Sequence, residues 1–105
     1  MQEREIVKKV DGISLTILDE RPQNPAATLN EWDVLTAPFV GESDKNFRTL
    51  VLPGDFDGAV QHILYAAKFA REGGKGKIDL TKVKLVRVDY DTARKWNLVA
   101  GITFV

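Results

Sequence analysis

An Asp-Gly dipeptide between two short β-prone segments restricts the fold of this chain more than any other feature. Asp11 and Gly12 separate the segments Glu5–Val10 and Ile13–Leu18. Both central residues of a type I′ turn need positive φ, and this dipeptide meets that need, so the pattern predicts a β-hairpin. Apolar residues alternate with Ser and Thr in the second segment, which predicts one buried face made of Ile13, Leu15 and Ile17.

One long helix is expected, from about Asp55 or Asp57 to Glu72. Either aspartate can cap its first turn by accepting hydrogen bonds from unpaired backbone amides. Two glycines from Gly73 onward then supply a residue that ends many helices. At helical spacing one broad face is apolar and should pack on a sheet; it consists of Phe56, Ala59, Val60, Ile63, Leu64, Ala67 and Ala70.

Three further residues of this helix form what we call the aromatic flank: His62, Tyr65 and Phe69. They are spaced i, i+3 and i+7, so they lie next to one another but outside the centre of the apolar face. Two interpretations are open. Either the flank is exposed and serves as a contact surface, since interfaces are rich in Tyr and other large amphipathic side chains, or the proline-containing loop Asp19–Asn30 covers it and completes the core.

The remaining elements are shorter. A polar turn is expected at Gly41–Asn46, and one helical turn at Asp91–Trp96 with Asp91 as its cap. Further strands are expected at Trp32–Thr36 (ending before Pro38), Phe47–Leu52, Val83–Tyr90 and Leu98–Val105. The order ββββαββ predicts one α+β domain over residues 1–105, in which a mostly antiparallel sheet of five to six strands carries the helix on one face.

Composition excludes several function classes. The 105 residues include no cysteine and one histidine, so a disulfide scaffold, a cysteine nucleophile and a zinc site built from Cys and His are excluded. Fifteen basic and fifteen acidic residues give zero net charge, which disfavours nucleic acid as a partner. No apolar run approaches the roughly 20 residues of a membrane span, so we expect no membrane contact and a cytoplasmic location.

Three short motifs resemble ligand sites but are incomplete. The run from Asp55 to Gly58 begins like a calcium loop, yet Ala66 stands where that loop needs a glutamate. Asp89 and Asp91 lack a third ligand nearby. The glycine- and lysine-rich run 73–77 follows a helix, whereas a phosphate-binding loop precedes one. We therefore predict neither a metal site nor a cofactor.

Few side chains are suited to catalysis or to ligand binding. His62 alone has an ordinary pKa near neutrality, and it can act as a general base if another group orients it. Trp96 follows two basic residues and can stack on an aromatic ligand or a base. Lys82 and Lys84 share one strand face, but Arg87 has the opposite parity, which weakens a basic strip.

These observations favour a small non-enzymatic domain that acts through protein–protein contact or as a homodimer, with no catalytic residue assigned. The candidate contact residues are the aromatic flank and Trp96. The alternative is a small-molecule-binding protein or simple enzyme with a pocket near His62, which predicts a concave cavity there. A third class, nucleic-acid binding, predicts a contiguous face of Lys and Arg.

Overall fold

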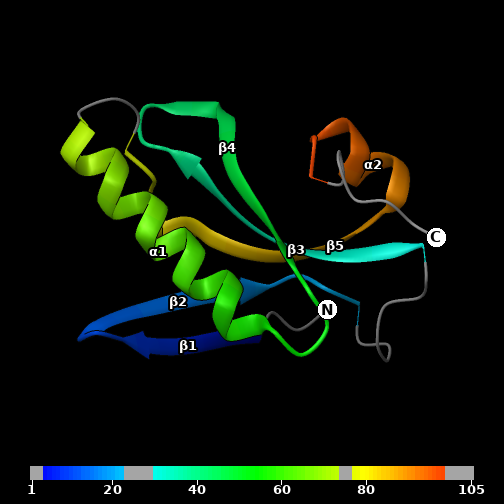
Figure 1. Ribbon diagram of the computed structural model, residues 1–105, viewed down its shortest axis with the longest axis horizontal. Helices are drawn as coiled ribbons and strands as arrows, with labels where there is room; N and C mark the ends of the chain where they lie inside the picture. Colours follow the sequence, from blue (N-terminus) through cyan, green and yellow to red (C-terminus); the bar gives the residue numbers. More distant parts are fainter. Residues whose placement is uncertain (1–3, 23–29, 74–76, 99–105) are drawn as a thin grey trace.

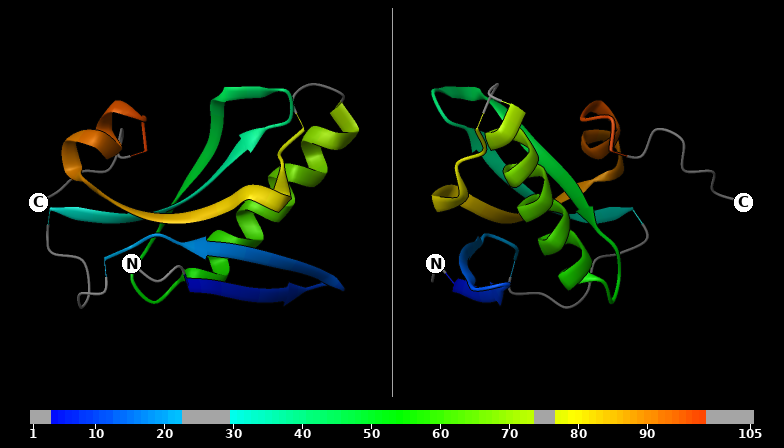
Figure 2. Two further views of the ribbon diagram at one scale, coloured as in Figure 1. Left: turned by 180° about the vertical axis from the view of Figure 1, so that it is seen from behind. Right: turned by 60° about the vertical axis from the view of Figure 1, so that its left-hand side comes forward.

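A five-stranded mixed sheet and one long helix make up the described part of the chain. The computed structural model describes residues 4–22, 30–73 and 77–98. Its elements are β1 (Arg4–Val10), β2 (Ile13–Asp19), β3 (Glu31–Phe39), β4 (Glu42–Val51), α1 (Phe56–Gly73), the 3₁₀ helix η1 (Leu80–Lys82), β5 (Val83–Asp89) and α2 (Tyr90–Lys95). The strand order is β1-β2-β5-β3-β4, and only the β2–β5 pair is parallel. Because α1 runs diagonally across one face of this sheet (Figure 1), as two further views also show (Figure 2), the predicted α+β class is confirmed.

The N-terminal hairpin has the predicted turn. Asp11 and Gly12 have φ values of +51° and +79°, as a type I′ turn requires. Leu15 and Ile17 are buried as expected, but Ile13 is 48% exposed. Ile13 pairs with Val10 directly beside the turn, so it lies at the end of the hairpin rather than in the middle of the sheet.

The core lies between the sheet and the predicted apolar face of α1. Ala59, Val60 and Ile63 are fully or almost fully buried there. The sheet contributes Leu15, Ile17, Leu35, Ala37, Val83 and Leu85. Helix α1 begins after Asp55, which therefore occupies the cap position. The Asp55 carboxylate fills the space that a Cβ at residue 58 would need, so glycine fits there.

The predicted polar turn Gly41–Asn46 is wrong. The turn consists of Val40 and Gly41 alone, with φ +81° at Gly41, and β4 starts at Glu42. The polar residues at the start of β4 are compatible with a strand because β4 lies at the edge of the sheet. The register of β3 with β4 also shifts there, since Phe39 pairs with Glu42 and the adjacent Pro38 pairs with Asn46. The expectation that β3 ends before Pro38 is also wrong.

Pro38 fits inside β3 because no ladder partner faces its nitrogen. Its carbonyl accepts a hydrogen bond from the Asp79 N–H at 2.8 Å, on the side of β5, whose pairing with β3 stops at Thr36. In an extended strand the nitrogen and carbonyl of one residue point the same way. The missing N–H of Pro38 therefore faces away from β4, and the β3–β4 ladder loses no hydrogen bond.

Helix α2 begins one residue earlier than expected, and its cap is Asp89 rather than Asp91. The Asp89 carboxylate accepts from the Thr92 N–H at 3.0 Å, while the Tyr90 N–H bonds to the Asn30 carbonyl and ends the strand. Three expectations fall outside the described residues: the final strand beyond Leu98, most of the long loop (residues 23–29) and the glycine run 74–76. Within the described ranges, no helix is both long and apolar enough to cross a membrane.

Candidate functional site

The aromatic flank faces solvent. Tyr65 is 66% exposed and Phe69 is 64% exposed, and their ring centroids are 5.9 Å apart. Both are therefore outside the core, although they belong to the helix that anchors it. The sequence left open whether the flank is exposed or covered, and in the structure Tyr65 and Phe69 are exposed.

His62 is held by its neighbours on β4. Its Nδ1 lies 2.8 Å from the hydroxyl of Thr49, a buried residue. The ring of Phe47 meets the imidazole edge-on, with centroids 5.4 Å apart and an interplanar angle of 72°. Among the described side chains, a hydroxyl rather than a carboxylate thus orients the imidazole. These contacts place His62 on the β4 side of α1.

A groove adjoins the flank between α1 and the end of the hairpin. It has a volume of about 870 Å³, which lies within the usual range for ligand pockets. Its walls are Val10, Asp11 and Ile13 on the hairpin and, on α1, Gly58, Gln61, His62, Leu64, Tyr65 and Lys68. The concavity predicted near His62 by the small-molecule alternative is therefore present as a groove.

Trp96 lies apart from the aromatic flank. The guanidinium of Arg48 lies over its indole ring, 4.2 Å from the centroid. Phe47 and Thr49 contact His62 on the α1 side, so Arg48 between them points to the opposite face of the sheet. The four candidate residues therefore form two separate sites, one on α1 and one beside α2.

The predicted basic strip does not assemble. Arg87 has the opposite parity, as expected, and its Nε donates to Asp33 at 2.8 Å on the α1 side. Lys84 lies 3.6 Å from the Glu20 carboxylate. Lys82 and Lys84 instead line a second hollow, of about 560 Å³, on the sheet face away from α1. Nucleic-acid binding gains no support from this arrangement.

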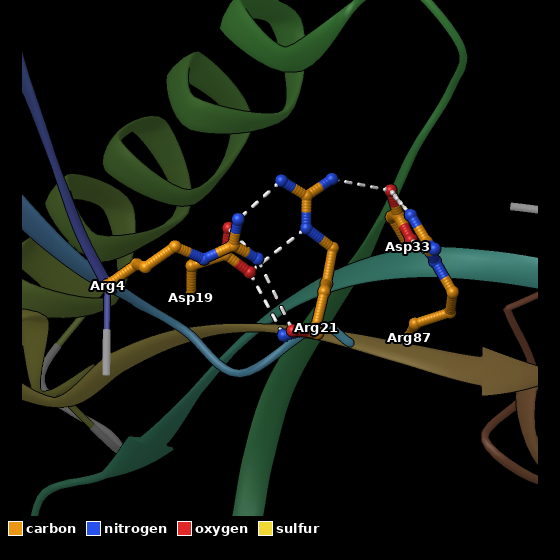
Figure 3. A network of polar contacts seen from close by, with 5 residues as sticks. All are labelled: Arg4, Asp19, Arg21, Asp33 and Arg87. Atoms are coloured by element: carbon orange, nitrogen blue, oxygen red, sulfur yellow. Dashed lines mark hydrogen bonds and ion pairs between the residues drawn. The ribbon is translucent and has the colours of Figure 1, made fainter. Parts of the chain in front are cut away.

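A network of five charged residues lies on the same face of the sheet as α1 and was not predicted (Figure 3). Arg21 donates from Nε and Nη2 to the two carboxylate oxygens of Asp19, both at 3.0 Å, and from Nη1 to Asp33 at 2.9 Å. Arg87 donates from Nε to the other carboxylate oxygen of Asp33 at 2.8 Å. The guanidinium of Arg4 lies 3.4 Å from the Asp19 carboxylate. The network connects β1, β2, β3 and β5 through side-chain ion pairs.

Arg21 keeps Asp19 ionised. Burial by itself raises the pKa of the Asp19 carboxyl, but the hydrogen bonds and positive charge of Arg21 outweigh burial and hold that pKa below its ordinary value of 3.8. The same hydrogen bond to Asp19 raises the pKa of Arg21. The ionised pair therefore contributes to stability at neutral pH.

Replacing Asp19 by the neutral asparagine is expected to reduce stability only at pH values at which the Asp19 carboxyl of the wild type is ionised. A depressed folded-state pKa contributes stability above the unfolded-state pKa, and this contribution disappears as pH falls through the folded-state value. We expect Asp19→Asn to cost about 1 to 3 kcal/mol at pH 7, and the difference from wild type to shrink as pH falls below 3.8. Urea unfolding at several pH values measures this difference, with Glu20→Gln at the neighbouring exposed carboxylate as the control. A difference independent of pH would contradict the assignment.

Three of the four acidic residues in the incomplete motifs have a structural place. Asp57 forms an ion pair with Lys8 at 2.8 Å, and Asp55 and Asp89 stand at the starts of α1 and α2. No group of three or more His, Asp or Glu side chains with metal-binding geometry occurs among the residues that the structure describes.

No protein-family model matches this chain, and no curated protein or solved structure is significantly similar to it. The surfaces described above are therefore the basis for inferring its function. These are the aromatic flank with its groove, the hollow on the opposite face and the two edges of the sheet.

Proposed function

We propose that this chain is a non-enzymatic domain that acts by binding protein chains, with the aromatic flank as a contact surface. One observation carries the proposal: Tyr65 and Phe69 lie side by side on a helix, and each exposes nearly two-thirds of its surface (66% and 64%). Single exposed apolar side chains are ordinary, but contiguous aromatic ones are typical of interfaces.

The flank is also rigidly mounted. Ala59, Val60 and Ile63 anchor the same helix in the core, and Thr49 fixes the imidazole of His62. A rigid aromatic surface loses little conformational entropy when a partner covers it, so more of the contact energy remains for affinity. This arrangement supports binding rather than catalysis, because orientation by a hydroxyl does little to strengthen an imidazole as a base.

The groove beside His62 favours a second candidate, the binding of a small molecule. Its volume suits a ligand, and Val10, Ile13 and Leu64 provide an apolar lining. A fragment screen read by protein NMR separates the two candidates. Saturable shifts confined to groove residues would support a ligand site, whereas their absence leaves protein contact as the function.

Site-specific photocrosslinking tests the proposed function. A photoreactive phenylalanine analogue at Phe69, introduced in the cells that make the protein, is expected to give a discrete protein adduct on irradiation. The same analogue at Lys45, an exposed residue of β4, serves as the control. Adding Tyr65→Ala should weaken the Phe69 adduct, because it removes the other exposed ring of the flank. Absence of an adduct, or equal adducts from both positions, would contradict the proposal.

A further inference from the structure

Strand β1 presents unpaired backbone groups along one edge of the sheet. It is the end strand of the described sheet and pairs only with β2. The two-residue turn makes Val10 and Ile13 a hydrogen-bonded pair, and such pairs alternate along an antiparallel ladder. The N–H and C=O groups of Glu5, Val7 and Lys9 therefore point away from β2, toward the open edge.

The side chains of these three residues lie on one face. Glu5, Val7 and Lys9 are exposed, and Val7 reaches 65%, whereas Ile6 and Val10 turn toward the core. An exposed apolar residue at the middle of an edge strand is a ready contact for another strand.

The other edge of the sheet is less suited to strand pairing. Strand β4 pairs with β3 through a register shift that leaves residues 43–45 without partners. Such bulges bend an edge strand and protect it from further pairing. Strand β1 has seven residues, no proline and a regular register over its whole length. Of the two edges, β1 is therefore the one that can accept a further strand.

The sequence of β1 is complementary to itself when it runs antiparallel to a second copy. If Val7 is the centre of symmetry, Val7 faces Val7 of the second copy, and Glu5 faces Lys9 of the second copy at both ends. These are the residues whose backbone groups point to the open edge, so each N–H can donate to the carbonyl opposite it. Opposite charges that face each other across strands are stabilising, and like charges are destabilising.

We infer that two copies of this chain pair through their β1 strands about a twofold axis at Val7, forming one continuous ten-stranded sheet from two five-stranded ones. The inference deepens the proposed function by naming one partner, a second copy, and the surface that binds it. The aromatic flank belongs to α1, so none of its residues takes part in this strand pairing. Tyr65 and Phe69 are left for contact with a different protein.

Charge exchange tests the pairing. Glu5→Lys places two lysines opposite each other at both ends of the contact, and Lys9→Glu does the same with two glutamates. Each variant is expected to raise the dimer dissociation constant about tenfold or more, as measured by light scattering over a concentration series. An equimolar mixture of the two variants is expected to form heterodimers, because their charges are then complementary. Glu42→Lys on the β4 edge is the matched control and should leave the dimer unchanged.

Three outcomes would overturn the inference: a wild type that is monomeric at every concentration, a dimer that tolerates both single variants, and single variants that dissociate but do not recombine when mixed. Because Glu5 and Lys9 are exposed, circular dichroism should show both variants folded. The photocrosslink at Phe69 is independent of these results. It can therefore succeed where the pairing fails, and an adduct made only of a second copy would move self-association to the flank.

Discussion

Replacing Asp33 by alanine is expected to lower the free energy of unfolding by about 2 to 3 kcal/mol, because it removes the one carboxylate that contacts two guanidinium groups. Asp33 accepts hydrogen bonds from both Arg21 and Arg87. The side chain of Arg87 is only 7% exposed, so water cannot replace the lost carboxylate. Urea unfolding at neutral pH measures the loss.

Glu42→Ala is the matched control for Asp33→Ala. Glu42 also belongs to an ion pair, with Lys45 at 3.4 Å, but both side chains are largely in solvent. Exposed pairs contribute at most about 1 kcal/mol, so this variant should be close to wild type. Equal losses in the two variants would show that the charged network is not the connection between strands that we infer.

Replacing Ile63 by alanine is expected to cost about 2 to 5 kcal/mol, because the residue is fully buried between α1 and the sheet and its truncation leaves a cavity. Phe69→Ala removes a larger side chain from the same helix, yet it should change the free energy of unfolding by only about 0.5 kcal/mol. Thermal and urea unfolding of the two variants measure this contrast.

The contrast also tests the basis of the proposed function. If Phe69→Ala destabilised the isolated chain as strongly as Ile63→Ala, Phe69 would be packed in the fold and the flank would not be a contact surface. A neutral Phe69→Ala leaves the ring without a structural role in the single chain, as an interface residue requires.

The elements that could be predicted are those determined by neighbouring residues. The Asp11-Gly12 turn follows from backbone φ preferences, and the apolar face of α1 follows from helical spacing. The start of β4 at Glu42 could not be predicted, because its polar residues resemble a turn and only the edge position makes them suitable for a strand. The place of Pro38 inside β3 could not be predicted either, since it depends on where the pairing of β3 with β5 stops.

Long-range features left no local signal. The parallel pairing of β2 with β5 joins segments separated by two strands and a helix. In the charged network, Asp33 is 12 residues from Arg21 and 54 from Arg87, so no motif connects them. The aromatic flank could be located by helical spacing, but its exposure could not, because that depends on which segment packs beside it.

The central claim is that this chain acts through contacts with protein chains, using the β1 edge for a second copy and the flank for a different protein. Light scattering over one concentration series on wild type, Phe69→Asp and Glu5→Lys tests it most directly. We predict a dimer for wild type, a folded dimer for Phe69→Asp and, for Glu5→Lys, a folded chain whose dimer dissociation constant is about tenfold higher or more. Monomers in all three would contradict self-association, and a dimer abolished by Phe69→Asp but kept by Glu5→Lys would contradict the division between the two surfaces.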